Sequence, residues 1–280
     1  MKSVRMLMTV NSYLTNLANK LILSPTEVSS INTSIETLAS RLDLYFGNNI
    51  NTHYEFGSST RGTILPRKAD ENSDIDYMII FGTASGYMKP QTYLDRLRRF
   101  TNDRYPMSEI YQSHPTLVLS LNHIKFELVP AINHFWYGLQ IPSPVSQWSD
   151  WMATNPKGLN QKLTSANTNN KSLIKPLIRL IKYWNACNDY PLNSYELENF
   201  VISANLYDDI ALWLNFILCN SLADYFYAFW NAFSYPSNKA QYLRDKVAKT
   251  KQRVKYIKSC ERSGNTPQAI IELQGLLPNL

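Results

Sequence analysis

The spacing of apolar residues changes near the middle of the chain. Up to about residue 140, short apolar runs typical of strands alternate with segments at helical spacing, whereas helical spacing prevails from residue 146 onward. We therefore predict an α+β chain in two parts, a core with an N-terminal helix at residues 1–145 and a helical lobe at residues 146–280. The polar stretch 155–171 is expected to connect the lobes.

Local signals predict the individual elements. Ser24, Pro25 and Glu27 have the pattern of a capping box with proline in the first turn, so a helix is expected from there to Phe46. The apolar run 77–81 is continuous, as in a central strand covered on both faces. The same patterns predict strands at 53–56, 74–81, 116–121 and 124–132, and helices at 90–104, 171–188, 194–204, 207–233, 239–262 and 267–277.

Composition narrows the class of protein. With 44% hydrophobic residues in 280, the chain can bury a real core. Its net charge of +6 suits polyanions such as nucleoside triphosphates, nucleic acid or an anionic membrane surface. Cys187, Cys219 and Cys260 lie far apart, which favours reduced thiols in a cytoplasmic protein without a zinc site. No signal-peptide pattern is seen, and Asp224 interrupts the apolar segment 210–233, so we expect a buried helix there and no membrane insertion.

Three carboxylates are candidates for a metal site. Asp74 and Asp76 are two apart at the start of an apolar strand, so both project from one face. Glu127 lies within another apolar strand, and it would join them if the two strands are neighbours. Hard oxygen ligands favour magnesium or manganese, and two such ions can clamp a phosphoryl displacement. The alternatives are a solvated strand end for the aspartates and a surface or salt-bridged residue for Glu127.

Gly57 and Ser58 follow a predicted strand directly upstream of these carboxylates. Glycine lets the backbone turn sharply and approach a ligand closely. Successive N–H groups in such a turn can bind an anion, and the serine hydroxyl adds a donor. The alternative is an ordinary turn at the end of a strand, because a Gly-Ser pair by itself carries little information.

The order of these motifs resembles the DNA polymerase β-like nucleotidyltransferase superfamily. The segments FGSSTRGT (56–63), SDID (73–76) and FELVPA (126–131) resemble the CD-NTases, the bacterial cGAS/DncV-like nucleotidyltransferases of CBASS anti-phage systems. LIRLIKYWN (177–185) and LNSYELE (192–198) are similar to the helical lobe that these enzymes share with oligoadenylate synthases and poly(A) polymerases. The resemblance implies a palm, a mixed sheet flanked by helices, packed against a C-terminal helical lobe.

The resemblance also implies roles for side chains. Asp74, Asp76 and Glu127 would bind Mg²⁺, with Mn²⁺ as the alternative, although the third ligand is usually aspartate in this group. Lys182 would contact the triphosphate, Ser194 would hydrogen-bond a phosphate, and Tyr195 would stack on the base of the donor nucleotide. The alternatives are a solvated lysine, a helix N-cap and a core aromatic, respectively.

The function implied is synthesis of a cyclic oligonucleotide second messenger, in the first place a cyclic dinucleotide, from nucleoside triphosphates in anti-phage defence. Two alternatives stay open: a template-independent transferase acting on RNA ends, and a catalytically silent fold that binds nucleic acid. Residues 239–262 hold nine basic and two acidic side chains. They form either a solvated basic face or a surface that attracts triphosphates or a regulatory protein, peptide or nucleic acid.

Overall fold

The computed structural model describes residues 8–84, 86–113, 115–143, 150–203, 220–234 and 240–280. They form two compact units, one of residues 23–161 and one that combines the N-terminal residues up to Ile22 with Lys162–Leu280. The chain therefore crosses between the units twice. The boundary that the sequence suggests after residue 145 stays a prediction about functional domains.

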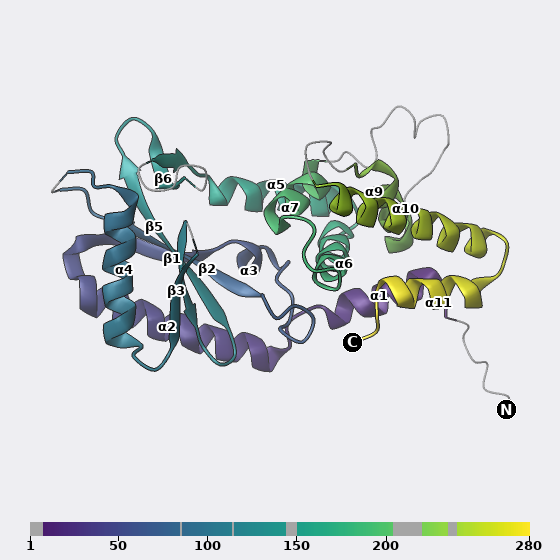
Figure 1. Ribbon diagram of the computed structural model, residues 1–280, viewed down its shortest axis with the longest axis horizontal. Coiled ribbons are helices and arrows are strands. Elements are labelled where there is room, and N and C mark those ends of the chain that lie inside the picture. Colours follow the sequence, from purple (N-terminus) through teal and green to yellow (C-terminus); the bar gives the residue numbers. More distant parts are fainter. Residues whose placement is uncertain (1–7, 85, 114, 144–149, 204–219, 235–239) are drawn as a thin grey trace. The chain divides into compact units, whose positions relative to one another are not determined.

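The first unit is built on a mixed sheet (Figure 1). Its strands run in the order β1-β2-β5-β4-β3, and β6 and β7 extend the sheet beyond the end of β5. The central pair β2 and β5 is parallel, and the remaining pairs are antiparallel. The strands are β1 (Ile50–Phe56), β2 (Asp74–Phe81), β3 (Glu109–Ser113), β4 (Thr116–Ser120), β5 (Lys125–His134), β6 (Gly138–Pro142) and β7 (Trp151–Ala153).

Helices α2 (Pro25–Phe46) and α4 (Pro90–Arg104) pack against the sheet. The predicted capping box at the start of α2 is confirmed, because the Ser24 hydroxyl accepts the Glu27 N–H at 3.2 Å and the Glu27 carboxylate accepts the Ser24 N–H at 2.8 Å. Both helices bury their apolar stripes on a cluster that includes Ile75 and Phe126. This packing holds the N-terminal ends of β2 and β5 in place.

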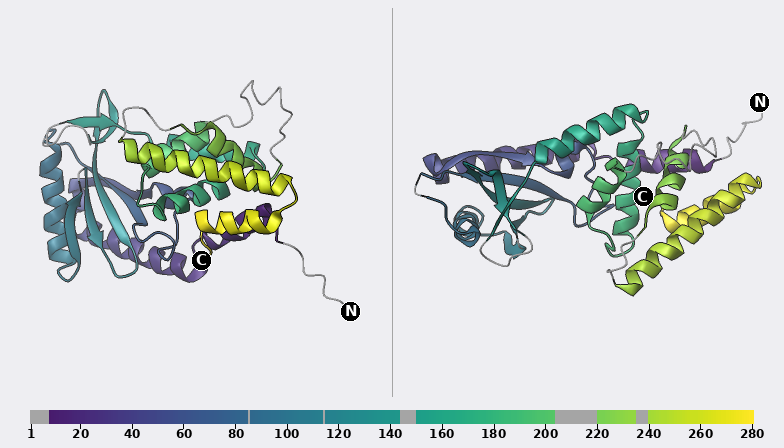
Figure 2. Two further views of the ribbon diagram at one scale, coloured as in Figure 1. Left: turned by 45° about the vertical axis from the view of Figure 1, so that its right-hand side comes forward. Right: turned by 90° about the horizontal axis from the view of Figure 1, so that it is seen from above.

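The second unit is helical. Its helices are α1 (Val10–Lys20), α6 (Ile174–Ala186), α7 (Ser194–Ser203), α9 (Leu222–Ala232), α10 (Gln241–Arg262) and α11 (Thr266–Leu276). Figure 2 shows α10 and α11 as an antiparallel pair. The N-terminal helix α1 belongs to this unit, since Tyr13 donates to the Leu277 carbonyl at 2.6 Å and Arg179 to the Ala18 carbonyl at 3.2 Å.

Two sequence-based expectations need comment. The stretch 155–171 was expected to be a connection, but most of it forms α5 (Pro156–Asn169), because Leu159 and Leu163 lie four residues apart and are buried on one face. The predicted helix 207–233 is described only in α9, and its earlier part lies outside the described residues. No helix among the described residues is long and apolar enough to cross a membrane.

Candidate active site

A sharp turn at the end of β1 brings backbone against a carboxylate. Gly57 has φ +81°, and a Cβ atom there would lie 1.8 Å from Oδ2 of Asp76. Only glycine fits this close approach. The turn is closed by the Ser58 carbonyl, which accepts the N–H groups of Thr63 (3.0 Å) and Ile64 (3.2 Å). Within the described residues the Ser58 hydroxyl has no hydrogen-bond partner, so it is available to a ligand.

The two carboxylate-bearing strands are neighbours, as predicted. Strand β2 pairs in parallel with β5, and in their register Asp76 lies beside Glu127. Asp74, Asp76 and Glu127 are all half-buried and alternate with fully buried residues such as Ile75 and Phe126. The three carboxylates therefore share one face of the sheet, at the N-terminal ends of two adjacent strands.

Glu127 is the electrostatically perturbed group of the three. Burial raises its pKa to about 7, and the Asp74 carboxylate adds to this through its charge and a hydrogen bond, while a hydrogen bond from Thr116 acts in the opposite direction. Two carboxylates in contact cannot both be ionised without cost. A proton or a cation shared between them relieves that repulsion.

The residues present fit a divalent cation in chemistry. The carboxylate oxygens are hard ligands. The contact between Asp74 and Glu127 brings two negative charges together, and a cation between them relieves the repulsion. Across the described ranges, however, no three Asp, Glu, His or Cys side chains lie at metal-binding distance. The assignment of Asp74, Asp76 and Glu127 as metal ligands stays a prediction.

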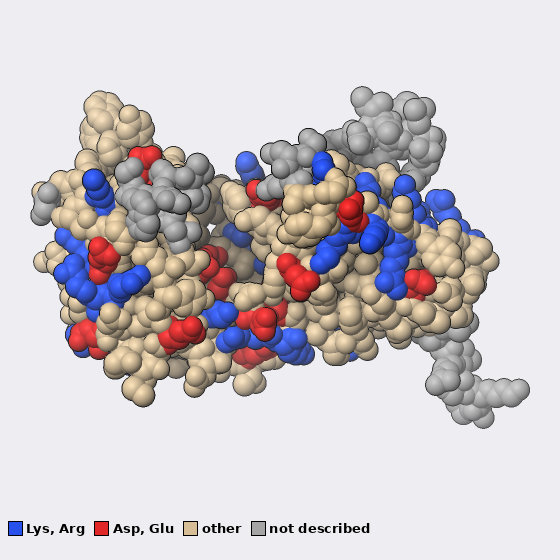
Figure 3. Space-filling model, in the orientation of Figure 1, with Lys and Arg blue, Asp and Glu red and all other residues tan. Residues whose placement is uncertain are grey.

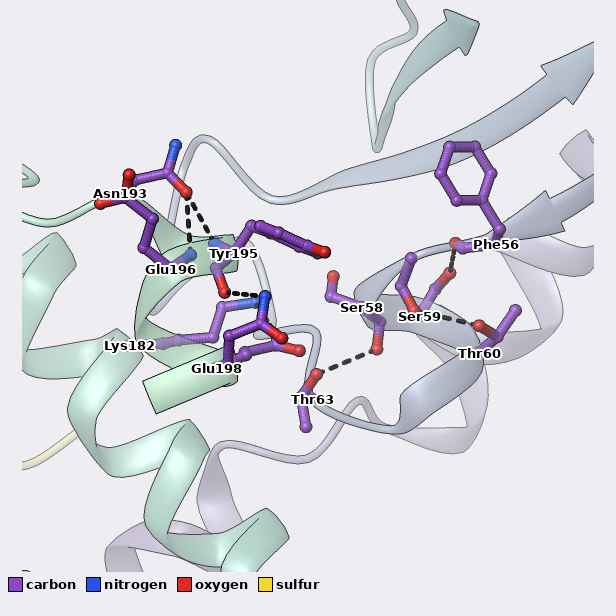
Figure 4. A network of polar contacts seen from close by, with 12 residues as sticks. Phe56, Ser58, Ser59, Thr60, Thr63, Lys182, Asn193, Tyr195, Glu196 and Glu198 are labelled. Atoms are coloured by element: carbon purple, nitrogen blue, oxygen red, sulfur yellow. Dashed lines mark hydrogen bonds and ion pairs between the residues drawn. The ribbon is translucent and has the colours of Figure 1, made fainter. Parts of the chain in front are cut away.

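The helical unit carries the other candidate residues, and Figure 4 shows two of them, Tyr195 at the start of α7 and Lys182 on α6. Tyr195 is 61% exposed, which excludes a core role and leaves its ring open to a ligand. Ser194 is exposed, but it is not the N-cap. That role belongs to Asn193, whose Oδ1 accepts the N–H groups of Tyr195 (3.0 Å) and Glu196 (3.1 Å). The Ser194 hydroxyl is thus not needed for capping.

Lys182 is not a solvated lysine. It lies on α6, is only 7% exposed, and places Nζ 3.4 Å from Oε1 of Glu198, which is buried on α7 (Figure 4). Glu198 belongs to the segment LNSYELE (192–198), and its role as the partner of Lys182 was not predicted. The sequence signal for a buried partner was the position of Glu198 next to Leu197 on the apolar face of α7, where burying a charge without a partner is costly. The Lys182 ammonium group that is assigned to the triphosphate is therefore already paired with a carboxylate.

More than half of the chain matches a known protein family. Residues 8–167 match the family model SMODS, the Second Messenger Oligonucleotide or Dinucleotide Synthetase domain. The chain belongs to the SMODS family. The predicted resemblance to CD-NTases is confirmed by this match, and the SMODS domain overlaps the whole sheet and the strand ends that carry Asp74, Asp76 and Glu127.

Individual relatives agree with the assignment. A probable cyclic nucleotide synthase of Bacillus cereus (strain VD146) is 29% identical over 181 residues, covering 52% of this chain and 54% of the relative. The chain thus spans about half the length of the curated relative that it matches. The activity and substrates of this chain are therefore taken up below as a proposal.

Solved structures confirm the predicted fold class. The cyclic AMP-GMP synthase DncV of Vibrio cholerae aligns with a TM-score of 0.73 at 10% identity, covering 97% of this chain and 96% of DncV. CdnC of E. coli MS115-1, solved in complex with HORMA-deltaN, aligns with a TM-score of 0.69 at 13% identity, covering 96% and 97% of the two chains. CdnC has also been solved with ATP. At these identities the likeness concerns the polymerase β-like fold.

Proposed function

We propose that this SMODS protein is a nucleotidyltransferase that joins nucleoside triphosphates into a cyclic oligonucleotide, in the first place a cyclic dinucleotide. The observation that carries the proposal is the convergence of a Gly57-Ser58 turn and three carboxylates at the ends of adjacent strands. Such a site offers donors to phosphate on one side and cation ligands on the other. The alternative of a catalytically silent fold would not need this arrangement.

Asp74, Asp76 and Glu127 would hold magnesium, or manganese in its place. A bound divalent cation would neutralise charge on the phosphates and stabilise the displacement at phosphorus. The chain's own groups orient the donor nucleotide. The N–H groups and hydroxyl of the Gly57-Ser58 turn bind phosphate oxygens, and Lys182 and Ser194 are assigned to the triphosphate. The exposed ring of Tyr195 stacks on the base.

Glu127 is assigned the proton transfer. A ribose hydroxyl of the second nucleotide forms a bond to the α-phosphorus of the first, and the bond from that phosphorus to pyrophosphate breaks. The Glu127 carboxylate would accept the hydroxyl proton and pass it to water. The linear dinucleotide retains one triphosphate. In the second reaction its own free hydroxyl attacks the α-phosphorus of that triphosphate, and a second pyrophosphate leaves. Ring closure is favoured because this attack is intramolecular.

The proposed setting is the cytoplasm of a bacterium under phage attack, where the product acts as a second messenger. A regulatory partner is expected as well. The support for a protein regulator is that CdnC, which has the same fold, was solved in complex with HORMA-deltaN. A peptide or nucleic-acid activator stays open.

The test is to incubate the purified chain with magnesium and all four nucleoside triphosphates, treat the products with phosphatase, and identify them by mass spectrometry. A ring has no terminal phosphate, so it survives phosphatase unchanged. Asp76→Asn should abolish pyrophosphate release, whereas the matched variant Asp103→Asn, at an exposed surface pair with Arg104, should not. A ladder of linear products would contradict the cyclase and support the RNA-end transferase. Absence of magnesium-dependent turnover would support the catalytically silent fold.

A further inference from the structure

The helical unit contains a basic site on α9 and α10, two helices that carry none of the residues assigned to catalysis or nucleotide binding. Helices α9 and α10 border a partly open cavity of about 70 Å³, lined by Tyr227 and Trp230 from α9 and by Lys251, Lys255 and Lys258 from α10. A single water needs about 10–15 Å³ by this kind of measure, so the cavity admits a group several times larger. None of these residues belongs to the predicted nucleotide site.

The three lysines form one row. Their spacing of four and then three residues places them on one face of α10, over about 10 Å of helix. Other basic residues of α10 are neutralised, Arg253 by Glu272 at 3.0 Å and Lys246 by Asp189 at 3.4 Å. Among the described residues, by contrast, no acidic side chain forms an ion pair with any lysine of the row. Figure 3 shows basic side chains gathered over this part of the molecule.

Two of the three lysines are held in place near the cavity. Lys251 donates to the carbonyls of Asn231 (3.2 Å) and Phe233 (2.8 Å), which leaves one of its three protons for a ligand. Lys258 lies over the Tyr227 ring, 5.2 Å from its centroid. Burial lowers the pKa of Lys251, and the charge of Lys255 lowers it further. A multivalent anion bound between the lysines would relieve that repulsion.

Two aromatic side chains of α9, Tyr227 and Trp230, form one wall of the cavity. Trp230 is 1% exposed, and its indole Nε1 has no hydrogen-bond acceptor among the described residues. Because this Nε1 atom is buried, the ring of Trp230 contributes an apolar wall to the cavity, and the lysines carry its charge. One acidic group lies close: Glu261 accepts the Tyr227 hydroxyl at 3.0 Å, and this hydrogen bond orients Tyr227.

From the cavity and the row of lysines without acidic partners we propose a binding site for a phosphate group, as carried by inorganic phosphate, pyrophosphate or a phosphorylated small molecule. Pyrophosphate binds more tightly than phosphate, because it presents more charge to the three ammonium groups. The site goes beyond the proposed catalytic function and does not depend on it.

The test follows the indole N–H signals of the full ¹⁵N-labelled chain by NMR while inorganic phosphate or pyrophosphate is added. Trp230→Phe identifies the Trp230 signal. That signal should shift to saturation, with a Kd for pyrophosphate of about 1 mM or below. Potassium chloride at matched ionic strength should leave it unchanged. The Asp76→Asn chain, which lacks the proposed activity, should bind equally well, so the two proposals fail separately.

Lys255→Ala combined with Lys258→Ala should weaken binding at least about tenfold, which corresponds to the loss of one strong charged contact. The matched control is Lys249→Ala, an exposed lysine on the same helix that does not line the cavity. The proposal is overturned if the control weakens binding as much, if potassium chloride reproduces the shift, or if the Trp230 signal does not respond. A response to single-stranded oligonucleotide alone would also overturn it.

Discussion

Replacing Glu127 by Gln should stabilise the metal-free protein at alkaline pH. Burial and Asp74 raise the pKa of Glu127 from 4.5 to about 7, so the folded state holds a proton that the unfolded state has already released. Between these two pKa values the unfolded state binds fewer protons, and stability falls as pH rises. Above pH 7 the full cost of ionising Glu127 in the folded state destabilises the protein, whereas below pH 4.5 this cost is absent.

The size of this effect follows from the shift. One pKa unit corresponds to about 1.4 kcal/mol, so the change from 4.5 to about 7 corresponds to at most about 3 kcal/mol. Glutamine keeps the shape of the side chain and is neutral at every pH. The variant should therefore be more stable than the parent chain by up to about 3 kcal/mol near pH 8 and about equal to it near pH 4.5.

Urea unfolding with a chelator present measures the free energy of unfolding of variant and parent at each pH. The contributions of other titrating groups cancel in the difference between the two. Glu36→Gln, on an exposed turn of α2, is the matched control and should show no pH-dependent difference. Added magnesium should then stabilise the parent near pH 8 and stabilise Glu127→Gln far less. An equal stability difference at both pH values would refute the crowded-carboxylate reasoning, and equal magnesium stabilisation would remove Glu127 from the metal site.

Three further predictions address other parts of the site. Gly57→Ala should cost about 1–3 kcal/mol of stability and abolish turnover, since its Cβ would displace the Asp76 carboxylate; denaturation and pyrophosphate-release assays measure both, and normal turnover would contradict it. Lys182→Ala should weaken triphosphate binding and cost about 3–5 kcal/mol of stability, because it removes the ammonium group that pairs with the buried Glu198 carboxylate. Adding Glu198→Gln should restore the stability but not the binding, and recovery of both would show that Lys182 is purely structural. Tyr195→Ala should weaken nucleotide affinity by about 1–3 kcal/mol without changing stability, and Tyr195→Phe should behave like the parent in the same titration.

The elements that could be predicted carry strong local signals. The start of α2 is specified by Ser24 and Glu27, three residues apart, and its capping box forms as predicted. The continuous apolar runs of β2 and β5 identify strands that are buried on both sides. Strands β3, β6 and β7 were not predicted. They are short and half-exposed, so their burial patterns are weak.

The sequence by itself determined the chemical inventory: a Gly-Ser turn, two carboxylates on one face, a third carboxylate in an apolar strand, and the family to which their order points. Only the tertiary structure decided which groups meet. The parallel register that places Asp76 beside Glu127, the approach of Gly57 to Asp76, and the pairing of Lys182 with Glu198 all join segments that are distant along the chain. The packing of α1 with the C-terminal helices is of the same kind. Local propensity acts within a few residues, whereas these contacts are set by the burial of whole faces of helices and strands, which no short segment encodes alone.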